Sequence, residues 1–305
     1  MSILVVGSVA FDSVKTPFGE VKEVLGGSAT YFSVAASFFS PVKLVAVIGD
    51  DFGEESLEVF RKHSIDIEGL KQVSGRTFRW SGEYGFALNE AKTLGTQLNV
   101  FEHFQPAIPE AYRHSEYVFL GNIDPILQRD VLRQVNQPKL VACDTMNYWI
   151  QSKPSELRKT LALVDILIIN DSEVRMMTNE PNLTKAAKEI RSWGPKALVV
   201  KKGEYGVAMF MDGSIFGAPA FPLEEVFDPT GAGDSFAGGF MGYLAKAGRL
   251  DEVTIRKAVI YGSVMASFSV EDFSLNRLKE LSPSEIQQRY RAFKHLTDFD
   301  VDEAF

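Results

Sequence analysis

The sequence contains very little cysteine and histidine. Among its 305 residues there is one cysteine, Cys143, and there are four histidines. A single cysteine excludes an internal disulfide framework and a cysteine metal cluster. No two histidines stand at a spacing typical of a metal site; they are His63, His103, His114 and His295. The chemistry of this chain is therefore expected to rest on carboxylates, amides and backbone groups.

Long apolar runs and a basic charge excess are also absent. No apolar stretch approaches the ~18 residues that a membrane span needs. The start, MSILVVGSVAFD, has no basic segment and meets Asp12 after a short apolar run, which predicts a strand and not a signal peptide. The formal net charge of −8 argues against a nucleic-acid or anionic-membrane binder, although a local basic pocket for a phosphate stays open. We expect a soluble, cytoplasmic protein.

Short apolar runs alternate along the chain with segments of helical period. Near-continuous apolar runs are typical of strands buried on both faces of a parallel sheet. Two segments between them have helical periodicity, residues 53–63 and 183–193. The pattern predicts an α/β fold with a central, mostly parallel sheet flanked by helices, and without a linker the whole chain, 1–305, reads as one domain. The expected strands are residues 3–9, 42–48, 117–121, 139–143, 165–170 and 197–201.

Two insertions break this alternation. Residues 76–104 alternate aromatic and polar side chains with glycines between them, and residues 13–25 have the same character. Such alternation favours antiparallel strands with one exposed face. We expect the two insertions to form a small β-lid; an edge extension of the main sheet is the alternative.

The stretch FDPTGAGDSFAGGF, residues 227–240, places glycines around one carboxylate, Asp234. It precedes an apolar segment, residues 234–244, that is expected to be helical. A helix N-terminus binds anions through free backbone N–H groups, and glycines let a phosphate approach them. An acid there makes sense if it accepts the proton of a hydroxyl that attacks phosphorus. The alternative is an ordinary first-turn acid at a helix start.

Other phosphate-binding loops do not fit this stretch. The pattern G-x-x-x-x-G-K-[ST] is absent from the chain, which excludes a P-loop. Gly231 and Gly233 have no glycine three residues later and lie far from the first strand, so the dinucleotide fingerprint fails as well.

The stretch DPTGAGDSFAGGF resembles the C-terminal signature of the ribokinase-like family, the PfkB carbohydrate kinases. Further segments resemble that family in the same order along nearly the whole chain: GSVAFD, GGSATYFSVAASFF, VIGDDFGEESLEVFRKHSID, NDSEV and VVKKGEYG. The resemblance implies the ribokinase-like fold and an ATP-dependent kinase of a small sugar or related polyol. It also implies a lid that closes over the sugar, with a homodimer through the lid as an option.

The resemblance assigns roles to individual residues of this chain. Asp234 is the implied catalytic base, within an anion hole formed by Gly231, Ala232 and Gly233. The implied substrate-binding residues are Asp12, Gly26, Gly27 and Ser28, with Tyr31 and Asn147 as further candidates. The implied ATP-binding residues are Asn170, Lys201, Gly203, Gly206, Thr230, Gly231, Gly233 and, near the adenine, Asn276. Glu173 and Asn170 are the implied magnesium site, through water.

Several of these residues have a purely structural alternative. Asp12 could cap a turn, and Lys201 could be a solvated strand end. Asn170 and Glu173 also match a capping box, a role that can coexist with magnesium binding. Gly203 and Gly206 could serve only a hairpin, and helix packing could explain the segment around Asn276.

Two positions depart from the sugar kinases of the family. Where these usually carry Asn, four residues after the glycine pair, this chain has Tyr31, which could stack on a ring or belong to the core. The segment DTMNYW only loosely echoes the Asp-x-Asn-x-Arg stretch of sugar-acid kinases, since Asp144 and Asn147 are one residue too far apart. An aromatic side chain in place of Asn favours a nucleoside or another cyclic polyol over a plain sugar.

The function that these patterns favour is ATP- and Mg²⁺-dependent phosphorylation of a hydroxyl on a small polyhydroxylated ring. A nucleoside kinase of the adenosine type is the alternative within the enzyme class. A non-catalytic ligand-binding or regulatory protein on the same fold is the alternative outside it. The carboxylate of Asp234 beside the glycine loop argues against the last, because a pure binder needs no base there. The expected partner is a small-molecule phosphate acceptor, with no nucleic acid and no membrane.

Overall fold

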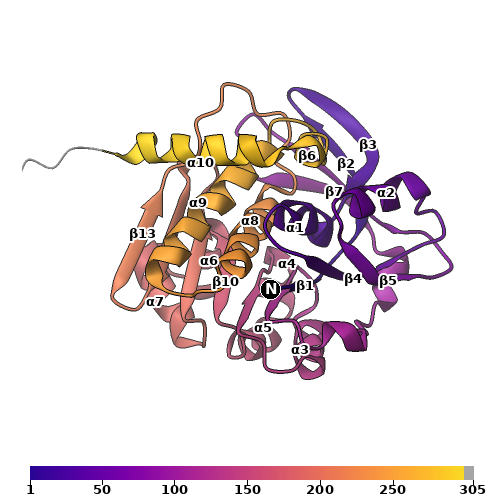
Figure 1. Cartoon of the computed structure of the whole chain (residues 1–305), viewed down its shortest axis with the longest axis horizontal. Helices are drawn as coiled ribbons and strands as arrows, with labels where there is room; N and C mark the ends of the chain where they lie inside the picture. Colours follow the sequence, from indigo (N-terminus) through magenta and orange to yellow (C-terminus); the bar gives the residue numbers. More distant parts are fainter. Residues whose placement is uncertain (299–305) are drawn as a thin grey trace, which may run out of the picture.

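The computed structural model describes residues 1–298 and is built on a nine-stranded sheet (Figure 1). All its strands are parallel to their neighbours except the last two at one edge, which run antiparallel. The order is β13 (Ser214–Ala218), β12 (Val207–Met211), β11 (Ala197–Lys201), β10 (Ile166–Asn170), β9 (Leu140–Cys143), β8 (Tyr117–Leu120), β1 (Ile3–Val6), β4 (Val42–Ile48) and β5 (Asp66–Gln72). This confirms the predicted α/β class; residues 299–305 of the predicted domain lie outside the described residues.

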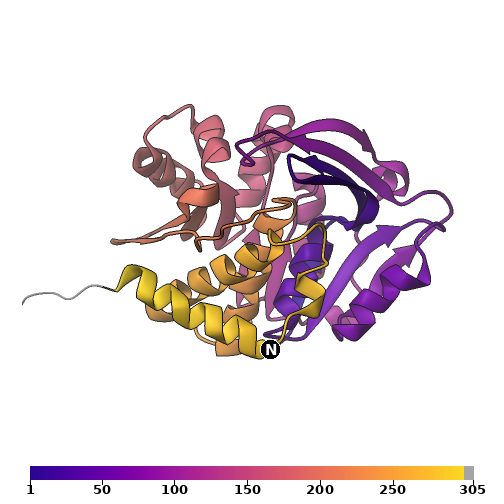
Figure 2. The ribbon, with the colours of Figure 1, turned by 90° about the horizontal axis from the view of Figure 1, so that it is seen from above.

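Helices cover both faces of this sheet, as Figure 2 shows. Alternate residues of β1 enter opposite cores, since side chains of a strand point to alternate faces. Ile3 and Val5 pack in one core, and Leu4 and Val6 in the other. The first core is covered by α1 (Ser28–Ser37), α8 (Ala232–Ala247), α9 (Glu252–Ser269) and α10 (Pro283–Thr297). The second is covered by α3 (Pro125–Gln134), α5 (Pro154–Leu161), α6 (Asp171–Thr178) and α7 (Leu183–Ser192).

Both predicted helices are present, as α2 (Glu54–Lys62) and α7. The first strand is shorter than predicted. It ends at Val6 and not at Val9, because the chain leaves the sheet at Gly7. A Cβ on Gly7 would lie 2.9 Å from Ser28 Oγ, so a glycine lets the start of α1 pack against this turn.

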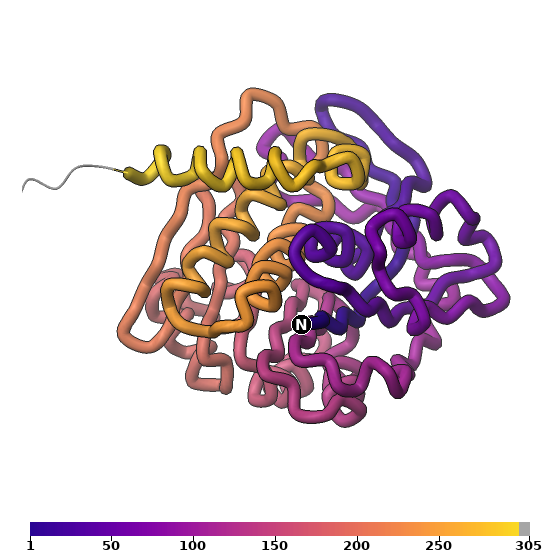
Figure 3. Tube along the Cα trace, in the orientation of Figure 1, coloured from indigo at the N-terminus to yellow at the C-terminus, as the bar shows by residue number. Residues whose placement is uncertain are grey.

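A separate four-stranded sheet stands beside the main one. Its order is β3 (Gly19–Gly26), β2 (Ala10–Thr16), β6 (Phe78–Tyr84) and β7 (Ala91–Gln97). The strands come from the two segments that the sequence analysis assigned to a β-lid, and β2 pairs with β6 in parallel although they are far apart in the chain. In Figure 3 the indigo hairpin of β2 and β3 projects at the upper right. We call this four-stranded sheet the lid sheet.

The lid sheet changes the place expected for Asp12. The sequence resemblance put this residue at the end of the first strand, but it lies in β2 of the lid sheet. The early end of β1 at Val6 is the reason, because the next strand is already part of the second sheet.

Within residues 1–298, no helix is both long and apolar enough to cross a membrane.

Candidate active site

Three neighbouring parallel strands place polar side chains at one edge of the main sheet. Asp144 directly follows β9, Asn170 ends β10, and Lys201 ends β11. Asn170 and Lys201 are register partners across the β10–β11 pair. In open α/β sheets the carboxyl ends of the strands are where ligands bind. This edge is therefore the candidate active site.

The glycine loop meets this edge at the start of α8. Gly231 has φ 74°, a left-handed conformation that side chains rarely adopt, and it is the N-cap of the helix. The helix begins at Ala232, two residues earlier than predicted, so Asp234 lies in its first turn. The amide of Ala232 donates to Pro229 O at 3.2 Å. First-turn amides lack an intrahelical acceptor, so those of Gly233 and Asp234 are left to bind an anion.

A lysine among carboxylates lies next to this loop. Lys201 Nζ is 3.5 Å from Asp144 Oδ2, and a Cβ on Gly233 would lie 2.6 Å from the same Nζ. Burial lowers the pKa of Lys201, but the carboxylates of Asp144, Glu173 and Asp234 raise it further, so its pKa lies above the ordinary value. The ammonium is therefore positively charged and placed where a phosphate would meet the loop.

Asp234 itself is a half-buried acid. Burial, followed by the Asp144 carboxylate, raises the pKa of Asp234 to about 7, against the opposing effect of Lys201. A carboxyl group with a pKa near neutrality is a better proton acceptor than an exposed one, and such shifts cluster at functional sites. Asp234 thus has the environment of a general base.

Asn170 and Glu173 form the capping box that the sequence offered as an alternative. Asn170 Oδ1 accepts from the Glu173 amide at 2.8 Å, and Glu173 Oε2 accepts from the Asn170 amide at 2.9 Å. Burial and the nearby Asp144 carboxylate raise the pKa of Glu173 to about 7. The capping bonds hold both side chains at the edge of the sheet, next to the lysine and carboxylate cluster.

The lid sheet brings a further buried carboxylate to the site. Asp12 is 4% exposed, and its Oδ2 accepts from the Gly27 amide at 3.3 Å. A Cβ on Gly26 would lie only 1.9 Å from that oxygen, so only glycine allows the carboxylate to lie there. Burial raises the pKa of Asp12 to about 7; the Gly27 amide opposes the shift, and Asp228 and Asp234 add to it. Asp12 and Asp234 are thus close enough to influence each other.

Two candidates on α1 have structural contacts in place of a free surface. The Ser28 and Ser8 hydroxyls lie 3.1 Å apart, and each also accepts from the other residue's amide, which pins the start of α1. Tyr31 is only 1% exposed, and its ring lies under Gly231, where a Cβ would be 2.4 Å from three ring carbons. Of the two roles left open for Tyr31, the geometry favours the core over stacking on a substrate.

The nucleotide-side candidates form a turn directly after Lys201. Gly203 begins a short 3-10 helix (Gly203–Tyr205), and the Lys202 amide donates to Gly206 O at 2.8 Å. Both glycines have positive φ, 56° and 85°. Asn147 is exposed at the start of α4 (Asn147–Ser152), where its Oδ1 accepts from the next amide at 2.8 Å.

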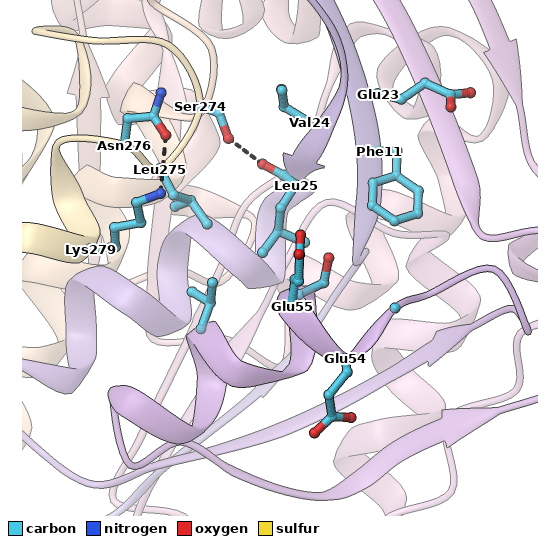
Figure 4. Close-up of a pocket in the computed structure, with 13 residues that line it drawn as sticks. Phe11, Glu23, Val24, Leu25, Glu54, Glu55, Ser274, Leu275, Asn276 and Lys279 are labelled. Carbon is cyan, nitrogen blue, oxygen red and sulfur yellow. Dashed lines mark hydrogen bonds between the residues drawn. The ribbon is translucent and has the colours of Figure 1, made fainter.

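Asn276 is not brought to this site. Figure 4 shows it in a different pocket, lined also by Phe11, by Glu54 and Glu55 of α2, and by Lys279, which donates to it at 3.2 Å. None of the other ATP-binding candidates lines that pocket. The chain after α9 is tied to β3, since Ser274 Oγ donates to Leu25 O, and Asn276 therefore faces α2.

Three residues at the site were not among the predicted site residues. Asp144 directly follows the predicted buried strand 139–143, and a polar residue at the carboxyl end of a parallel strand is a signal that could have found it. Asp228 lies in the quoted glycine stretch; its Oδ1 accepts from the Thr230 amide at 2.9 Å and its Oδ2 from the Ser274 amide at 3.2 Å. Tyr84 of β6 contacts Thr230, with the two hydroxyl oxygens 3.3 Å apart. No local sequence signal predicts that contact, because it depends on how the lid sheet docks.

Known proteins resemble this chain over most of its length. The family model described as pfkB family carbohydrate kinase matches residues 2–280. A cytidine kinase of Thermococcus kodakarensis is 29% identical, over 83% of this chain and 91% of that protein. A ribokinase of Lactococcus lactis is 26% identical, over 89% of this chain and 91% of that protein. The crystal structure of aminoimidazole riboside kinase from Salmonella enterica, with aminoimidazole riboside and an ATP analogue, superposes with a TM-score of 0.76 at 18% identity, covering 95% of this chain and all of that one.

Proposed function

The chain belongs to the pfkB family of carbohydrate kinases and is a phosphotransferase with an alcohol group as acceptor, and from that premise we propose its reaction and its residues. We propose that it transfers the γ-phosphoryl group of ATP to a hydroxyl of a small sugar or related polyol. The observation that carries the proposal is the half-buried carboxylate of Asp234, with its pKa raised to about 7, in the first turn of α8 beside Lys201.

In the proposed reaction Asp234 takes the proton of the acceptor hydroxyl as its oxygen forms a bond to the γ-phosphorus. The bond from that phosphorus to the bridging oxygen breaks, and ADP leaves with the electron pair. The amides of Gly233 and Asp234 and the ammonium of Lys201 stabilise the negative charge on the transferring group, which is the main task of a phosphoryl-transfer site. Thr230, Gly203 and Gly206 supply the backbone around the ATP phosphates.

Magnesium fits the residues at this site only as an ion shared with phosphate and water. Over the described range 1–298 no group of three or more His, Cys, Asp or Glu side chains could hold a metal ion. Mg²⁺ usually takes one or two carboxylates and completes its shell with waters and substrate phosphates. Glu173 and Asn170 would hold it through water, and its charge would offset that of the ATP phosphates.

The acceptor would lie between Asp12 and Asp234. Asp12 is buried and Asp234 half-buried, the Asp234 carboxylate raises the pKa of Asp12, and Asp12 is supplied by the lid sheet. A carboxylate accepts hydrogen bonds only, so Asp12 would select a ring that offers hydroxyl donors. Tyr31, for which stacking on a ring was one of two open roles, is packed under Gly231, and this favours a sugar or cyclic polyol over a ligand held by its aromatic base.

A nucleoside is the second candidate for the acceptor. The observation in its favour is the 29% identity to a cytidine kinase over 83% of this chain. A nucleoside also carries a sugar ring with hydroxyls, which could contact Asp12 in the same way. The two candidates differ in whether a free sugar is phosphorylated as well as its nucleoside.

The test is acceptor-dependent ADP release by the purified protein with ATP and MgCl₂. Pentoses, hexoses, cyclitols, sugar acids and nucleosides are assayed in parallel. Release that requires a sugar or cyclitol supports the main proposal, and release that requires a nucleoside supports the second. If ADP is released equally with and without every acceptor, or not at all, the proposed function is wrong and a binding or regulatory protein on this fold is the better account.

A further inference from the structure

Tyr84 of the lid sheet contacts the glycine loop next to the proposed anion hole. It ends β6, the strand that pairs with β2, and its hydroxyl oxygen lies 3.3 Å from Thr230 Oγ1. Thr230 is the residue directly before Gly231, the N-cap of α8. A lid side chain is thus bonded to the residue that leads into the proposed anion hole.

Thr230 and Gly231 are held from three directions. Asp228 Oδ1 accepts from the Thr230 amide at 2.9 Å, and Tyr84 bonds to the Thr230 hydroxyl. Beneath them the ring of Tyr31 lies against Gly231. Two of these contacts are made within the main body of the protein. The Tyr84 contact is the one that comes from the lid sheet.

A second contact places the tip of the same hairpin over the nucleotide turn. A Cβ on Gly203 would lie 2.5 Å from Asn89 Oδ1, and Asn89 lies in the turn between β6 and β7. The hairpin of β6 and β7 therefore contacts both the glycine loop, through Tyr84, and the turn at Gly203, through Asn89.

We infer that Tyr84 is a positioning residue, which fixes Thr230 from the lid sheet and so aligns the amides of Gly233 and Asp234 whenever the lid sheet lies against the glycine loop, as it does in this structure. This inference rests on the proposed kinase function and goes beyond it. It explains how the site could avoid transferring the phosphoryl group to water, since an open lid leaves the loop without its third support.

The test compares Tyr84→Phe with Glu83→Gln. The first keeps the ring and removes only the hydroxyl; the second changes the adjacent lid residue, whose carboxylate pairs with Lys15 on the exposed side, and is the matched control. One net hydrogen bond is worth about 0.5–1.5 kcal/mol, so we expect Tyr84→Phe to lower kcat roughly 2- to 10-fold. The KM for ATP and the melting temperature should stay close to those of the control.

The partner residue makes the test specific. Thr230→Val removes the other hydroxyl and should lower kcat as Tyr84→Phe does, whereas Thr230→Ser, which keeps it, should restore most of the activity. In the double variant Tyr84→Phe/Thr230→Val the losses should not add, because both remove the same bond. Additive losses, or a Tyr84→Phe variant with the kinetics of Glu83→Gln, would overturn the inference.

Amide hydrogen exchange separates this inference from the proposed function. In the protein without ligands, Tyr84→Phe should speed exchange of residues 230–235 and 85–91 relative to Glu83→Gln. If the exchange rates of these residues do not change, the inferred role of the contact is wrong, whatever the activity of the variant. If the wild-type protein releases no ADP with any acceptor but the exchange changes as expected, the kinase proposal fails while the coupling of lid and loop stands.

Discussion

The strands of the main sheet and of the lid sheet are buried to different degrees. Strands β8 and β9 are buried at every position, whereas β7 has no buried residue and β6 has one, Gly82. The main sheet carries Asp144, Asn170 and Lys201 on rigid strand ends. The lid sheet carries Asp12 and Tyr84. The proposed function thus assigns the chemistry to the main sheet and its helices, and shares the recognition of the acceptor with the less buried lid sheet.

The largest expected effect belongs to the main sheet and its helices. Asp234→Asn keeps the shape of the side chain but cannot accept the proton, so kcat should fall by about 10²–10⁴-fold, the usual contribution of a general base. The KM for ATP should stay within a few fold. ADP-release kinetics measure both values. A variant that turns over normally would show that Asp234 is only a first-turn acid of α8.

The next effect belongs to the lid. Arg79 and Gln97 face each other across β6 and β7, so residues 80–96 can be deleted and the two joined through Asn-Gly, a two-residue hairpin turn. This keeps the ion pair between Arg79 and Asp51. The KM for the acceptor should rise by roughly tenfold or more, the loss of at least ~1.4 kcal/mol of binding free energy. ADP release without acceptor should increase, because water gains access.

Acceptor kinetics that do not change in this deletion variant would contradict the role given to the lid sheet. The main sheet and the lid sheet would then differ in burial, and this difference would have no effect on activity. ATP binding serves as the control for folding, since the deletion leaves β10, β11 and α8 untouched.

A smaller effect concerns stability and pH. The pKa of Asp234 rises from 3.8 in the unfolded chain to about 7 in the folded protein, so the folded state binds the extra proton between these values. Its contribution to the free energy of unfolding is therefore present below pH 4 and is lost as pH rises through 7. Asp234→Asn has no such loss. The melting temperature of Asp234→Asn, minus that of the wild-type protein, should therefore increase between pH 5 and pH 8. A difference that does not change with pH would contradict the pKa that burial raises at Asp234.

The smallest effect is expected at the tip of the lid. Phe86 is 96% exposed in the turn after β6. Phe86→Ser should change the free energy of unfolding by no more than about 0.5 kcal/mol and leave the kinetics unchanged, as surface substitutions usually do. If two copies pair through the lid, the same change should lower the molecular mass measured by light scattering. A clear loss of stability in a protein of single-chain mass would show that Phe86 is not exposed in solution.

The two sheets also differ in how well their sequences predict them. β4 and β11 occur with the predicted bounds, because a strand buried on both faces must be apolar throughout. The lid strands are recognisable in kind from their alternation, but the register and partners are not. The pairing of β2 with β6 joins segments that are distant in the chain, and no local pattern predicts it. Asp12 was therefore expected at the end of the first strand, whereas it lies in β2.

The predicted site residues divide in the same way, into those placed by local sequence and those placed by long-range contacts. Residues within one short motif, such as Asn170 with Glu173, make the contacts that their spacing allows. Asn276 was misplaced, because the bond from Ser274 to Leu25 that turns the chain away is a long-range contact. The contact of Tyr84 with Thr230 is of the same long-range kind, and no local pattern announces it.

The most direct test of the central claim is the pH dependence of kcat/KM for the acceptor, in the wild-type protein and in Asp234→Asn. A base must be ionised to work, so a pKa of about 7 predicts that wild-type kcat/KM rises about tenfold per pH unit below 7 and levels off above it. Because the pKa of Asp12 is also about 7, Asp12→Asn is measured alongside and should keep the rise. The residual kcat/KM of Asp234→Asn should not show this rise with pH. A rise with the same midpoint in Asp234→Asn would contradict the account, because another group would then be the base.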